Sequence, residues 1–419
     1  MMTTRRLSIL RVLAAAGLVV GMGAYAFAAG AAPAASKGAA PKAAAPKAAV
    51  VKKDEPAITA PHAILIDAQN GSVLFERDAD ALIFPASLAK LMTVEYVLNE
   101  IKQGRVKLTD EYVVSENAWR KGGAPSHSST MFAALHSKVS VDDLLHAVVI
   151  QSANDACIVL AEAIAGNEAE FAAKMTKRAR EIGLSKSVFT NSNGLPDPDT
   201  KVTSRELSIL ARHLILDYPK FYPTFSEREF TWNKIKQPNR NPLLTMEIGA
   251  DGLKTGYTKD AGYGLVGSAV QNGLRLIAVV NGLNTPKERA EEGKKLLEWG
   301  FRNFEMRPLF AEGQTVGEAK VFGGDKGYVP LVSPAVQVMV PKAGGERITA
   351  RIIYTGPLPA PVQKGLNVGT LKVWRNDTLV LEVPLKTSEA IGRGSVTQRA
   401  FDSVTELVIN LFRAGVERI

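Results

Sequence analysis

A serine and a lysine three residues apart, Ser87 and Lys90, form the first pair of side chains in this chain that could perform chemistry. In a helix this spacing places both side chains on one face, about one turn apart. A serine hydroxyl is a poor nucleophile until a base removes its proton, and a lysine can be that base only when it is neutral. The pair therefore indicates acyl transfer with lysine as the base. A helix-capping serine followed by a solvated lysine would give the same spacing.

A second candidate set, Lys254-Thr255-Gly256, stands ahead of an apolar segment with strand character. Glycine lets a substrate backbone approach a strand edge closely, where a peptide can add itself as a further strand. Burial lowers the pKa of a lysine, and so does a neighbouring cation. We therefore expect Lys254 to lie beside Lys90 as that cation.

A third element is needed to relay protons and to position a substrate, and two S-x-N strings are available. Ser152 and Asn154 stand at the start of a strongly helical segment, where their side chains can face a cleft. Ser115 and Asn117 are expected in a loop. A bare S-x-N string is a weak motif. The choice of Ser152 and Asn154 depends largely on the family resemblance described below.

The elements expected around these residues define an α+β fold. Segments 63–67 and 72–76 are joined by Gln69-Asn70-Gly71, a turn typical of a β-hairpin. A helix is expected to begin at Pro85, with the serine of the first pair in its first turn, where free N–H groups favour developing negative charge. The remaining expected elements are helices within 139–217, strands at 230–232, 264–270 and 274–280, and a helix at 287–301. This order predicts an antiparallel sheet whose first and last strands come from distant parts of the sequence.

The chain divides into five predicted segments. Residues 1–28 have a basic start, an apolar run and a small-x-small site, the pattern of a cleaved signal peptide, with an uncleaved membrane anchor as the alternative. Residues 29–56 are an Ala/Pro/Lys-rich linker, 57–305 hold the motifs, and 306–390 have the short strands of a small all-β domain. Residues 391–419 predict an amphipathic helix. We expect it to anchor the protein at a membrane surface, with packing on the β-rich domain or self-association as alternatives.

Composition limits the possible partners. With 46% apolar and 22% charged residues, the chain can form a sizeable core. The net charge of +9 falls to 9 − 3 = +6 without the three arginines of residues 1–28, and this remainder suits an anionic surface such as a membrane. Basic and aromatic residues are not interleaved, so no nucleic acid is expected. The single cysteine, Cys157, allows no internal disulfide, and its apolar neighbours indicate a buried side chain. The five histidines have no paired-ligand spacing, so no metal or other cofactor is expected.

The three motifs, in this order, resemble those of the penicillin-binding proteins and serine β-lactamases. The flanking sequence is similar to low-molecular-mass D-alanyl-D-alanine carboxypeptidases across roughly 57–390. The segments that carry this similarity are 66–68, 71–74, 85–87, 151–157, 239–241 and 251–256. The resemblance implies a penicillin-binding or β-lactamase-like transpeptidase fold, followed by a small all-β domain and a C-terminal amphipathic helix.

The resemblance also implies an activity. The enzyme would remove the terminal D-alanine from peptidoglycan stem pentapeptides through an acyl-enzyme on Ser87, and penicillin and other β-lactams would inhibit it. Lys90 would be the general base for acylation. Ser152 would pass a proton to the leaving amine, and Lys254 would hold Ser152 and the local potential.

The remaining site residues are implied in the same way. Asn154 would hydrogen-bond the substrate amide, while Thr255 and Arg240 would bind the terminal carboxylate. The backbone N–H groups of the nucleophilic serine and of Tyr257, which follows Gly256, would form the oxyanion hole. A histidine often follows this motif in relatives, so Tyr257 is a departure that bears on the pH dependence and on the rate of deacylation.

Three alternatives stay open. An endopeptidase that cuts crosslinks would use the same site. A serine β-lactamase would need a group that activates the deacylating water, and residues 183–250 contain no E-x-x-L-N string. A catalytically silent scaffold of the cell envelope is the third. The expected location is the periplasm, with attachment to the outer face of the inner membrane through the C-terminal helix.

Overall fold

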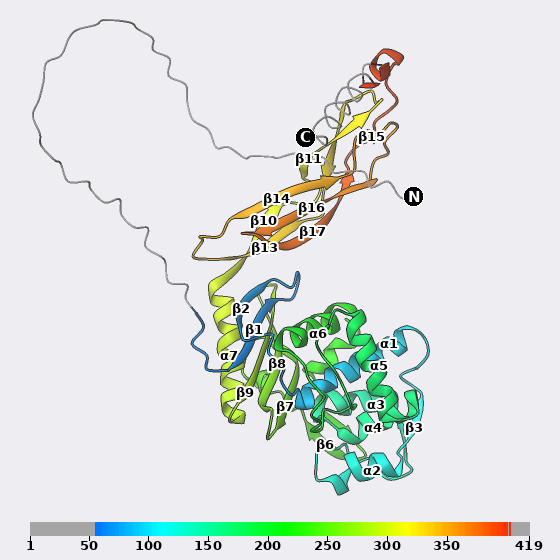
Figure 1. Ribbon diagram of the computed structural model, residues 1–419, viewed down its shortest axis with the longest axis vertical. Helices are drawn as coiled ribbons and strands as arrows, with labels where there is room; N and C mark the ends of the chain where they lie inside the picture. The colour runs from blue at the N-terminus through cyan, green and yellow to red at the C-terminus, as the bar shows by residue number, and fades with distance from the viewer. Residues whose placement is uncertain (1–54, 401, 404–419) are drawn as a thin grey trace, which may run out of the picture.

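The computed structural model describes residues 55–400, 402 and 403. They form a region of helices around a sheet, followed along the chain by a region made of strands (Figure 1). The predicted signal peptide at 1–28, most of the predicted linker at 29–56 and most of the predicted C-terminal helix lie outside the described residues.

An antiparallel sheet forms the centre of the first region. Its strands, in spatial order, are β2 (Val73–Arg77), β1 (His62–Asp67), β9 (Leu274–Leu283), β8 (Gly262–Gln271) and β7 (Ala250–Thr258). Strand β1 pairs with β2 as the predicted hairpin and with β9 on its other side, so the first and last strands of the sheet are neighbours, as predicted. Strand β7 pairs with β8 and forms an edge of this sheet.

The apolar residues of the sheet alternate between two cores. In β1, Ile64 and Ile66 belong to one buried cluster, whereas Ala63 and Leu65 belong to the other. This alternation follows from the period of two along a strand. Helix α7 (Pro286–Asn303) packs on the second face through residues such as Leu296, and the other helices gather on the first face (Figure 1).

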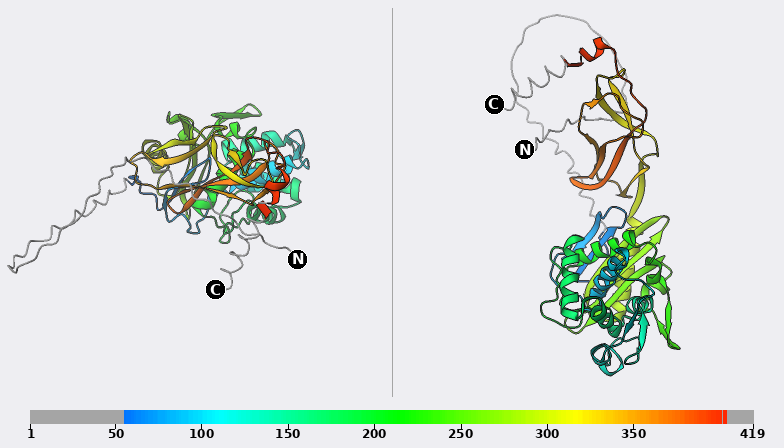
Figure 2. Two further views of the ribbon diagram at one scale, coloured as in Figure 1. Left: turned by 90° about the horizontal axis from the view of Figure 1, so that it is seen from above. Right: turned by 90° about the vertical axis from the view of Figure 1, so that its right-hand side faces the viewer.

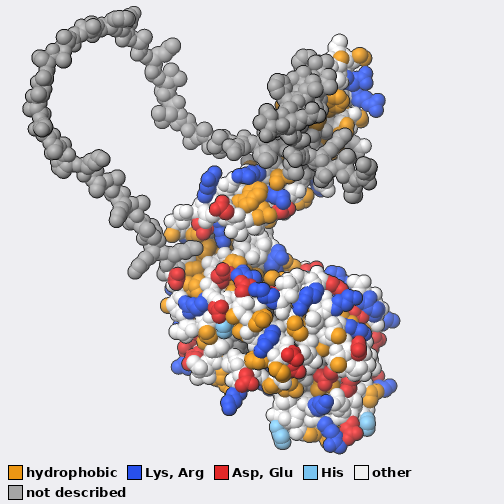
Figure 3. Space-filling model, in the orientation of Figure 1, with side chains coloured by type: hydrophobic (Ala, Val, Ile, Leu, Met, Phe, Trp, Pro, Cys, Tyr) orange, Lys and Arg blue, Asp and Glu red, His pale blue; other side chains and the backbone are white. Residues whose placement is uncertain are grey.

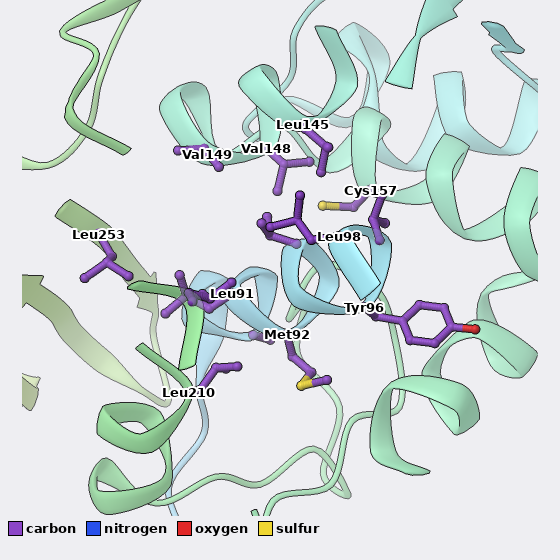
Figure 4. Packing of buried hydrophobic residues seen from close by; sticks show 14 of the residues in the cluster. Leu91, Met92, Tyr96, Leu98, Leu145, Val148, Val149, Cys157, Leu210 and Leu253 are labelled. Atoms are coloured by element: carbon purple, nitrogen blue, oxygen red, sulfur yellow. The ribbon is translucent and has the colours of Figure 1, made fainter. Parts of the chain in front are cut away.

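The helices on the first face hold the larger core. They are the 3₁₀ helix η1 (Ala86–Ala89), α1 (Lys90–Lys102), α2 (Glu116–Gly122), α3 (Val141–His146), the π-helix η3 (Ala147–Gln151), α4 (Asn154–Ala165), α5 (Glu168–Glu181) and α6 (Ser204–Asp217). Figure 4 shows Leu91 and Met92 of α1 among side chains from the surrounding elements, including Leu210 of α6 and Leu253 of β7. Helix α1, which directly follows the segment of Ser87, is therefore fixed in a dense apolar core.

Short elements complete the first region. They are the hairpins β3 (Glu111–Val113) with β4 (Lys138–Ser140) and β5 (Glu229–Trp232) with β6 (Ile235–Pro238), and the 3₁₀ helices η2 (Ala124–Ser126), η4 (Tyr222–Ser226) and η5 (Pro242–Thr245).

The second region consists of two sheets, as its short alternating segments predict. One pairs β10 (Phe304–Phe310) with β13 (Val336–Pro341). The other has the order β14 (Ile348–Tyr354), β16 (Asn367–Arg375), β17 (Thr378–Thr387), β12 (Tyr328–Val332), β11 (Thr315–Phe322) and β15 (Leu358–Pro359). A separate apolar cluster fills this region.

The two regions meet through specific contacts. Helix α7 continues directly into β10, and Figure 2 shows the strand-rich region extending from this end of the first region. The Arg375 guanidinium donates a hydrogen bond across the junction to the carbonyl of Val73 at 2.8 Å. Met339 of β13 packs into the core on the α7 side of the first region's sheet.

The beginning of the predicted C-terminal helix is visible. Residues 396–400, 402 and 403 are helical. Ser395 and Gln398 form a capping box, in which the Gln398 N–H donates to Ser395 Oγ at 3.3 Å and the Ser395 N–H to Gln398 Oε1 at 2.8 Å. Asp402 accepts a hydrogen bond from the Gly323 N–H at 2.8 Å, so this first turn lies against β-rich structure. None of the helices in the described part of the chain is long and apolar enough to span a bilayer.

Charges of both signs are interspersed over the face of the first region shown in Figure 3. The active-site groups described next are mostly buried, so their electrostatics depend on local contacts more than on this surface.

Candidate active site

Ser87 and Lys90 lie together where the chain enters helix α1. Ser87 is in η1 and Lys90 is the first residue of α1, so the predicted helix start is correct except that its first turn is 3₁₀. Lys90 Nζ donates to Ser87 Oγ at 3.0 Å and to the carbonyl of Asn193 at 2.5 Å. The lysine side chain is 0% exposed. The geometry is that of a nucleophile with its base already in contact.

Burial lowers the pKa of both lysines of the site. It lowers the pKa of Lys90 from 10.5 to about 8, and the positive charge of Arg240 acts in the same direction. The pKa of Lys254 is lowered well below its usual value, first by burial and then by Lys90 and Arg240. Burial is the largest cause at both lysines. Because repulsion between two lysines is mutual, the effect of Lys90 on the pKa of Lys254 agrees with the expectation that the two lysines lie close together.

Ser152 occupies a special backbone position between two helices. It follows η3 and precedes α4, with φ of +65° in the left-handed region that residues other than glycine seldom adopt. Within the described part of the chain, the buried Ser152 Oγ has no hydrogen-bond partner, and the same is true of Asn154 Oδ1. Asn154 Nδ2 donates to Ser128 Oγ at 2.9 Å. Buried polar atoms of this kind point to partners supplied by a ligand or water.

The other S-x-N string has a structural role. Ser115 caps α2, where its Oγ accepts from the Ala118 N–H at 2.9 Å and donates to Glu162 Oε2 at 2.6 Å. Asn117 Nδ2 donates to Glu162 Oε1 at 2.8 Å. The side chains of Ser115 and Asn117 are thus hydrogen-bonded within the fold. This supports the choice of Ser152 and Asn154 as the candidate site residues.

The Lys254-Thr255-Gly256 motif lies within strand β7 itself, not ahead of the strands as expected. Lys254 Nζ donates to the carbonyl of Thr255 at 3.2 Å. A Cβ added to Gly256 would lie 3.0 Å from the carbonyl oxygen of Pro85 and 3.2 Å from the N atom of Leu88. The glycine thus allows the nucleophile's segment to approach the edge strand.

A cavity of about 480 Å³ brings these elements together. Its lining contains six of the predicted residues: Ser87, Ser152, Arg240, Thr255, Gly256 and Tyr257. Lys90 and Lys254 are buried behind this lining. Asn154 Nδ2 donates to Ser128 Oγ, and the next residue, Ser129, lines the cavity. The structure therefore gathers the whole predicted set around one cavity.

Three lining residues, Ser129, Tyr263 and Arg289, were not predicted. Tyr263 pairs with Tyr257 across β7 and β8, and their rings stack with centroids 4.0 Å apart. The register of the β7–β8 hairpin could have revealed Tyr263. Arg289 lies on α7 with its guanidinium 5.5 Å from the Tyr263 ring centroid, and no sequence motif marks it.

The cavity has a cationic wall. Arg240 Nε donates to Gln151 Oε1 at 3.4 Å, and burial lowers the pKa of both Arg240 and Arg289. Arg289 Nε is buried without a hydrogen-bond partner among the described residues. Two partly desolvated guanidinium groups beside the nucleophile are suited to bind a carboxylate.

Buried acid and thiol groups nearby belong to the framework. Asp155 accepts from Thr130 Oγ1 at 2.6 Å and from the Met131 N–H at 3.0 Å, which fixes the loop that carries Ser129. Cys157 is buried, as predicted, and burial raises the pKa of its thiol to about 12, which disfavours the reactive thiolate. Among the described residues, no group of three or more His, Cys, Asp and Glu side chains could hold a metal ion.

Comparison with known proteins shows the family of this chain. Residues 49–285 match the family model described as D-alanyl-D-alanine carboxypeptidase, and residues 304–393 match the model described as penicillin-binding protein 5, C-terminal domain. The chain belongs to the D-alanyl-D-alanine carboxypeptidase family. The predicted family, fold class and serine-peptidase activity are thereby confirmed.

Individual relatives cover most of the chain. The D-alanyl-D-alanine carboxypeptidase DacC of Escherichia coli is 40% identical over 84% of this chain and 89% of its own length. DacA of Haemophilus influenzae is 38% identical over 85% and 91%. The crystal structure of penicillin binding protein 5 from Haemophilus influenzae aligns with a TM-score of 0.71 and 39% identity, over 81% of this chain and 99% of that one. Penicillin-binding protein D2 from Listeria monocytogenes in its ampicillin-bound form aligns with a TM-score of 0.53 and 31% identity, over 59% and 99%.

Proposed function

We propose that the protein removes the terminal D-alanine from peptidoglycan stem pentapeptides through an acyl-enzyme on Ser87. The observation that carries this proposal is the 3.0 Å contact from Lys90 Nζ to Ser87 Oγ. The lowered pKa of about 8 lets a useful fraction of Lys90 be neutral near neutral pH.

Acylation would begin when neutral Lys90 accepts the proton of Ser87 Oγ. The oxygen attacks the carbonyl carbon of the penultimate D-alanine, and the resulting oxyanion accepts hydrogen bonds from the backbone N–H groups of Ser87 and Tyr257. The C–N bond then breaks, and the proton taken up by Lys90 reaches the departing amine through Ser152, which gives its own proton to the amine and regains one from Lys90. The unpartnered Ser152 Oγ, buried at the cavity wall, supports this relay.

The substrate would lie along the edge strand β7. Its terminal carboxylate is bound by Thr255 and Arg240, and Asn154 contacts the substrate amide. Arg289, on the same wall, adds positive potential near the carboxylate. Water then cleaves the ester on Ser87, which releases the tetrapeptide and restores the serine.

Free D-alanine release from a soluble pentapeptide tests this function, with a crosslinked peptide dimer as the second substrate. We expect release from the pentapeptide by the wild-type enzyme and none above background after Ser87→Ala. Cleavage of the dimer alone would replace the proposal with an endopeptidase. D-Alanine release that survives Ser87→Ala would overturn the role of this serine.

β-Lactams are proposed to acylate the same serine. One similar structure is in an ampicillin-bound form and another, of the same Listeria protein, in a cefotaxime-bound form. Slow loss of the penicillin adduct is expected, because the enzyme is a carboxypeptidase. Rapid turnover of penicillin would instead support a β-lactamase.

Export to the periplasm and attachment to the inner membrane complete the proposal. The N-terminal sequence pattern of residues 1–28 supports export. The amphipathic pattern of residues 391–419 and the capped helix start at Ser395 support a terminal anchor. Deletion of residues 397–419 should move the protein from the membrane fraction to the soluble periplasm. An unchanged membrane fraction would contradict the anchor.

A further inference from the structure

A cavity of about 350 Å³ lies on the strand-rich region and shares no lining residue with the active-site cavity. Its lining residues are Arg347, Thr349, Arg351, Trp374, Asn376 and Asp377. The first three are alternate residues at the start of β14, and the others lie at the end of β16 and in the turn after it. Because alternate residues of a strand share a face, the cavity lies on one face of the six-stranded sheet. The opposite face packs Ile352 and Val373 into the apolar cluster of this region.

Trp374 gives this cavity an apolar surface. Its indole is partly exposed and lies opposite Thr349 of β14, and its partner on β17 is Leu379, which is 41% exposed. An indole and a leucine side by side at the surface offer an apolar contact for a ligand. The face of an aromatic ring is electronegative, so it attracts the C–H groups of a saccharide ring, which carry partial positive charge.

The two arginines of the cavity are available to bind an anion. Arg347 and Arg351 are exposed, and neither guanidinium has a hydrogen-bond or ion-pair partner among the described residues. The guanidinium of Arg351 lies 5.3 Å from the ring centroid of Trp374, which places this positive charge beside the indole. Asp377 adds one carboxylate, so the positive charges outnumber the negative one. A guanidinium can bind a carboxylate through two parallel hydrogen bonds.

Hydrogen bonds fix the polar rim of the cavity. The Arg347 N–H donates to Asn376 Oδ1 at 3.0 Å, and the Asn376 N–H donates to the carbonyl of Arg347 at 2.8 Å. These bonds join the β16–β17 turn to β14 and leave Asn376 Nδ2 available as a donor. Together with Thr349 and Asp377, it can bond to the hydroxyl and amide groups of a sugar. An apolar surface with a few fixed polar groups is typical of a binding site for a small molecule or a polymer segment.

The cavity and the beginning of the C-terminal helix belong to opposite edges of the sheet. Strand β14 is one edge and β15 the other. Asp402 of the helix bonds to Gly323, which directly follows β11, the neighbour of β15. Arg375, the residue after Trp374, bonds instead to Val73 of the first region. This arrangement favours a partner on the side of the catalytic region over a lipid surface beside the C-terminal helix.

We propose that this cavity binds a saccharide ring that carries a carboxylate, as found in the glycan strand of peptidoglycan. The ring packs on Trp374, and Arg347 and Arg351 bind its carboxylate. The inference rests on the proposed function for the choice of polymer, and it adds a second, non-catalytic contact with that polymer. Two contacts with one polymer raise the local concentration of stem peptides at the active site.

Glycan strands freed of their peptides test this proposal, because their sugars keep carboxylates but offer no D-alanine to the active site. The measurement is the Kd of the complete protein for these strands. Trp374→Ala should raise the Kd about tenfold, the scale of one aromatic contact in a binding site. The double variant Arg347→Gln with Arg351→Gln should raise it about fivefold and keep the wild-type unfolding temperature, because both side chains are exposed. Neutral oligomers of N-acetylglucosamine should bind more weakly than the strands, with a Kd that the double variant does not change.

Tyr328→Ala is the matched control. Tyr328 is an aromatic residue of the same sheet and is 52% exposed, but it does not line the cavity. This variant should keep the wild-type Kd.

The proposal is overturned if the wild-type protein does not bind the strands, or if Trp374→Ala and the double variant both keep the wild-type Kd. It is also overturned if Trp374→Ala weakens binding to phosphatidylglycerol vesicles and leaves strand binding intact, which would assign the cavity to a lipid surface. All the variants should release D-alanine from a soluble pentapeptide with the wild-type kcat/KM. Failure of the wild-type enzyme in that assay would contradict the proposed function, whereas the Kd values would still decide whether the cavity binds the glycan.

Discussion

Two buried polar regions on helix α1 differ in how their charges are compensated. Lys90 and Glu95 are both 0% exposed. Lys90 has another lysine, Lys254, among the groups that share its surroundings, and each lysine has a lowered pKa. Glu95 Oε1 instead accepts from Arg178 Nε at 3.0 Å and from the Tyr218 hydroxyl at 3.1 Å. The first arrangement suits the proposed reaction, which needs a neutral lysine, and the second stabilises the packing of helices.

The two S-x-N strings repeat this difference. Ser115 donates and accepts hydrogen bonds within the framework, whereas the buried Ser152 Oγ has no partner among the described residues. The polar atoms of the Ser115 string are satisfied within the fold, whereas the unsatisfied Ser152 Oγ is free to take the proposed catalytic role.

The largest effect is expected for Lys90→Met. Removal of the base should slow acylation by penicillin about 10³-fold. The same change should raise the free energy of unfolding at pH 7 by about 3 kcal/mol, since a pKa lowered from 10.5 to about 8 disfavours the charged folded form. Acylation kinetics and urea unfolding measure the two effects. A variant that acylates normally, or that is less stable than wild type, would contradict this interpretation.

Glu95→Gln should lower the stability of the fold and leave acylation almost unchanged, the opposite of the two effects expected for Lys90→Met. Without the carboxylate charge, the half-buried Arg178 loses its buried partner, and we expect unfolding to become easier by about 3 kcal/mol. The folded variant should acylate at nearly the wild-type rate. The comparison would fail if the acylation rate fell as far as it does in Lys90→Met.

Ser152→Ala and Ser115→Ala form a matched pair. The first should reduce D-alanine release about 100-fold with little change in stability, because no framework bond is lost. The second should cost about 1 kcal/mol of stability as a lost helix cap and leave D-alanine release unchanged. Reversed results would show that the catalytic role belongs to the Ser115 string and that Ser152 is structural.

The pH dependence gives the smallest effect. With a Lys90 pKa of about 8, the neutral fraction and the acylation rate should rise about tenfold between pH 7 and 9 and then level off. The stability deficit relative to Lys90→Met is fully present below about pH 8 and should disappear as the pH rises toward 10.5. A flat rate profile would show that Lys90 does not limit acylation through its protonation.

Local patterns predicted much of the fold and the core of the site. The β1–β2 hairpin followed from its turn residues, and the Ser87–Lys90 contact followed from helical spacing. The placement of Lys254 in β7 was missed, because strand prediction relies on apolar runs and this strand buries polar functional residues.

The remaining differences arise from tertiary packing. Arg289 reaches the cavity only because α7 packs across the sheet, and no local signal carries that information. Ser152, with its positive φ, stands at the end of a π-helix, and the sequence carried no local signal for either feature. The family resemblance, not local spacing, selected Ser152 and Arg240.

Mass spectrometry of the penicillin adduct after proteolysis tests directly whether Ser87 is the residue that is acylated. We expect one adduct, on the peptide that contains Ser87, with no labelling of Ser87→Ala and normal labelling of Ser115→Ala. An adduct on Ser152 or any other residue, or covalent labelling that persists in Ser87→Ala, would contradict the acyl-enzyme on Ser87.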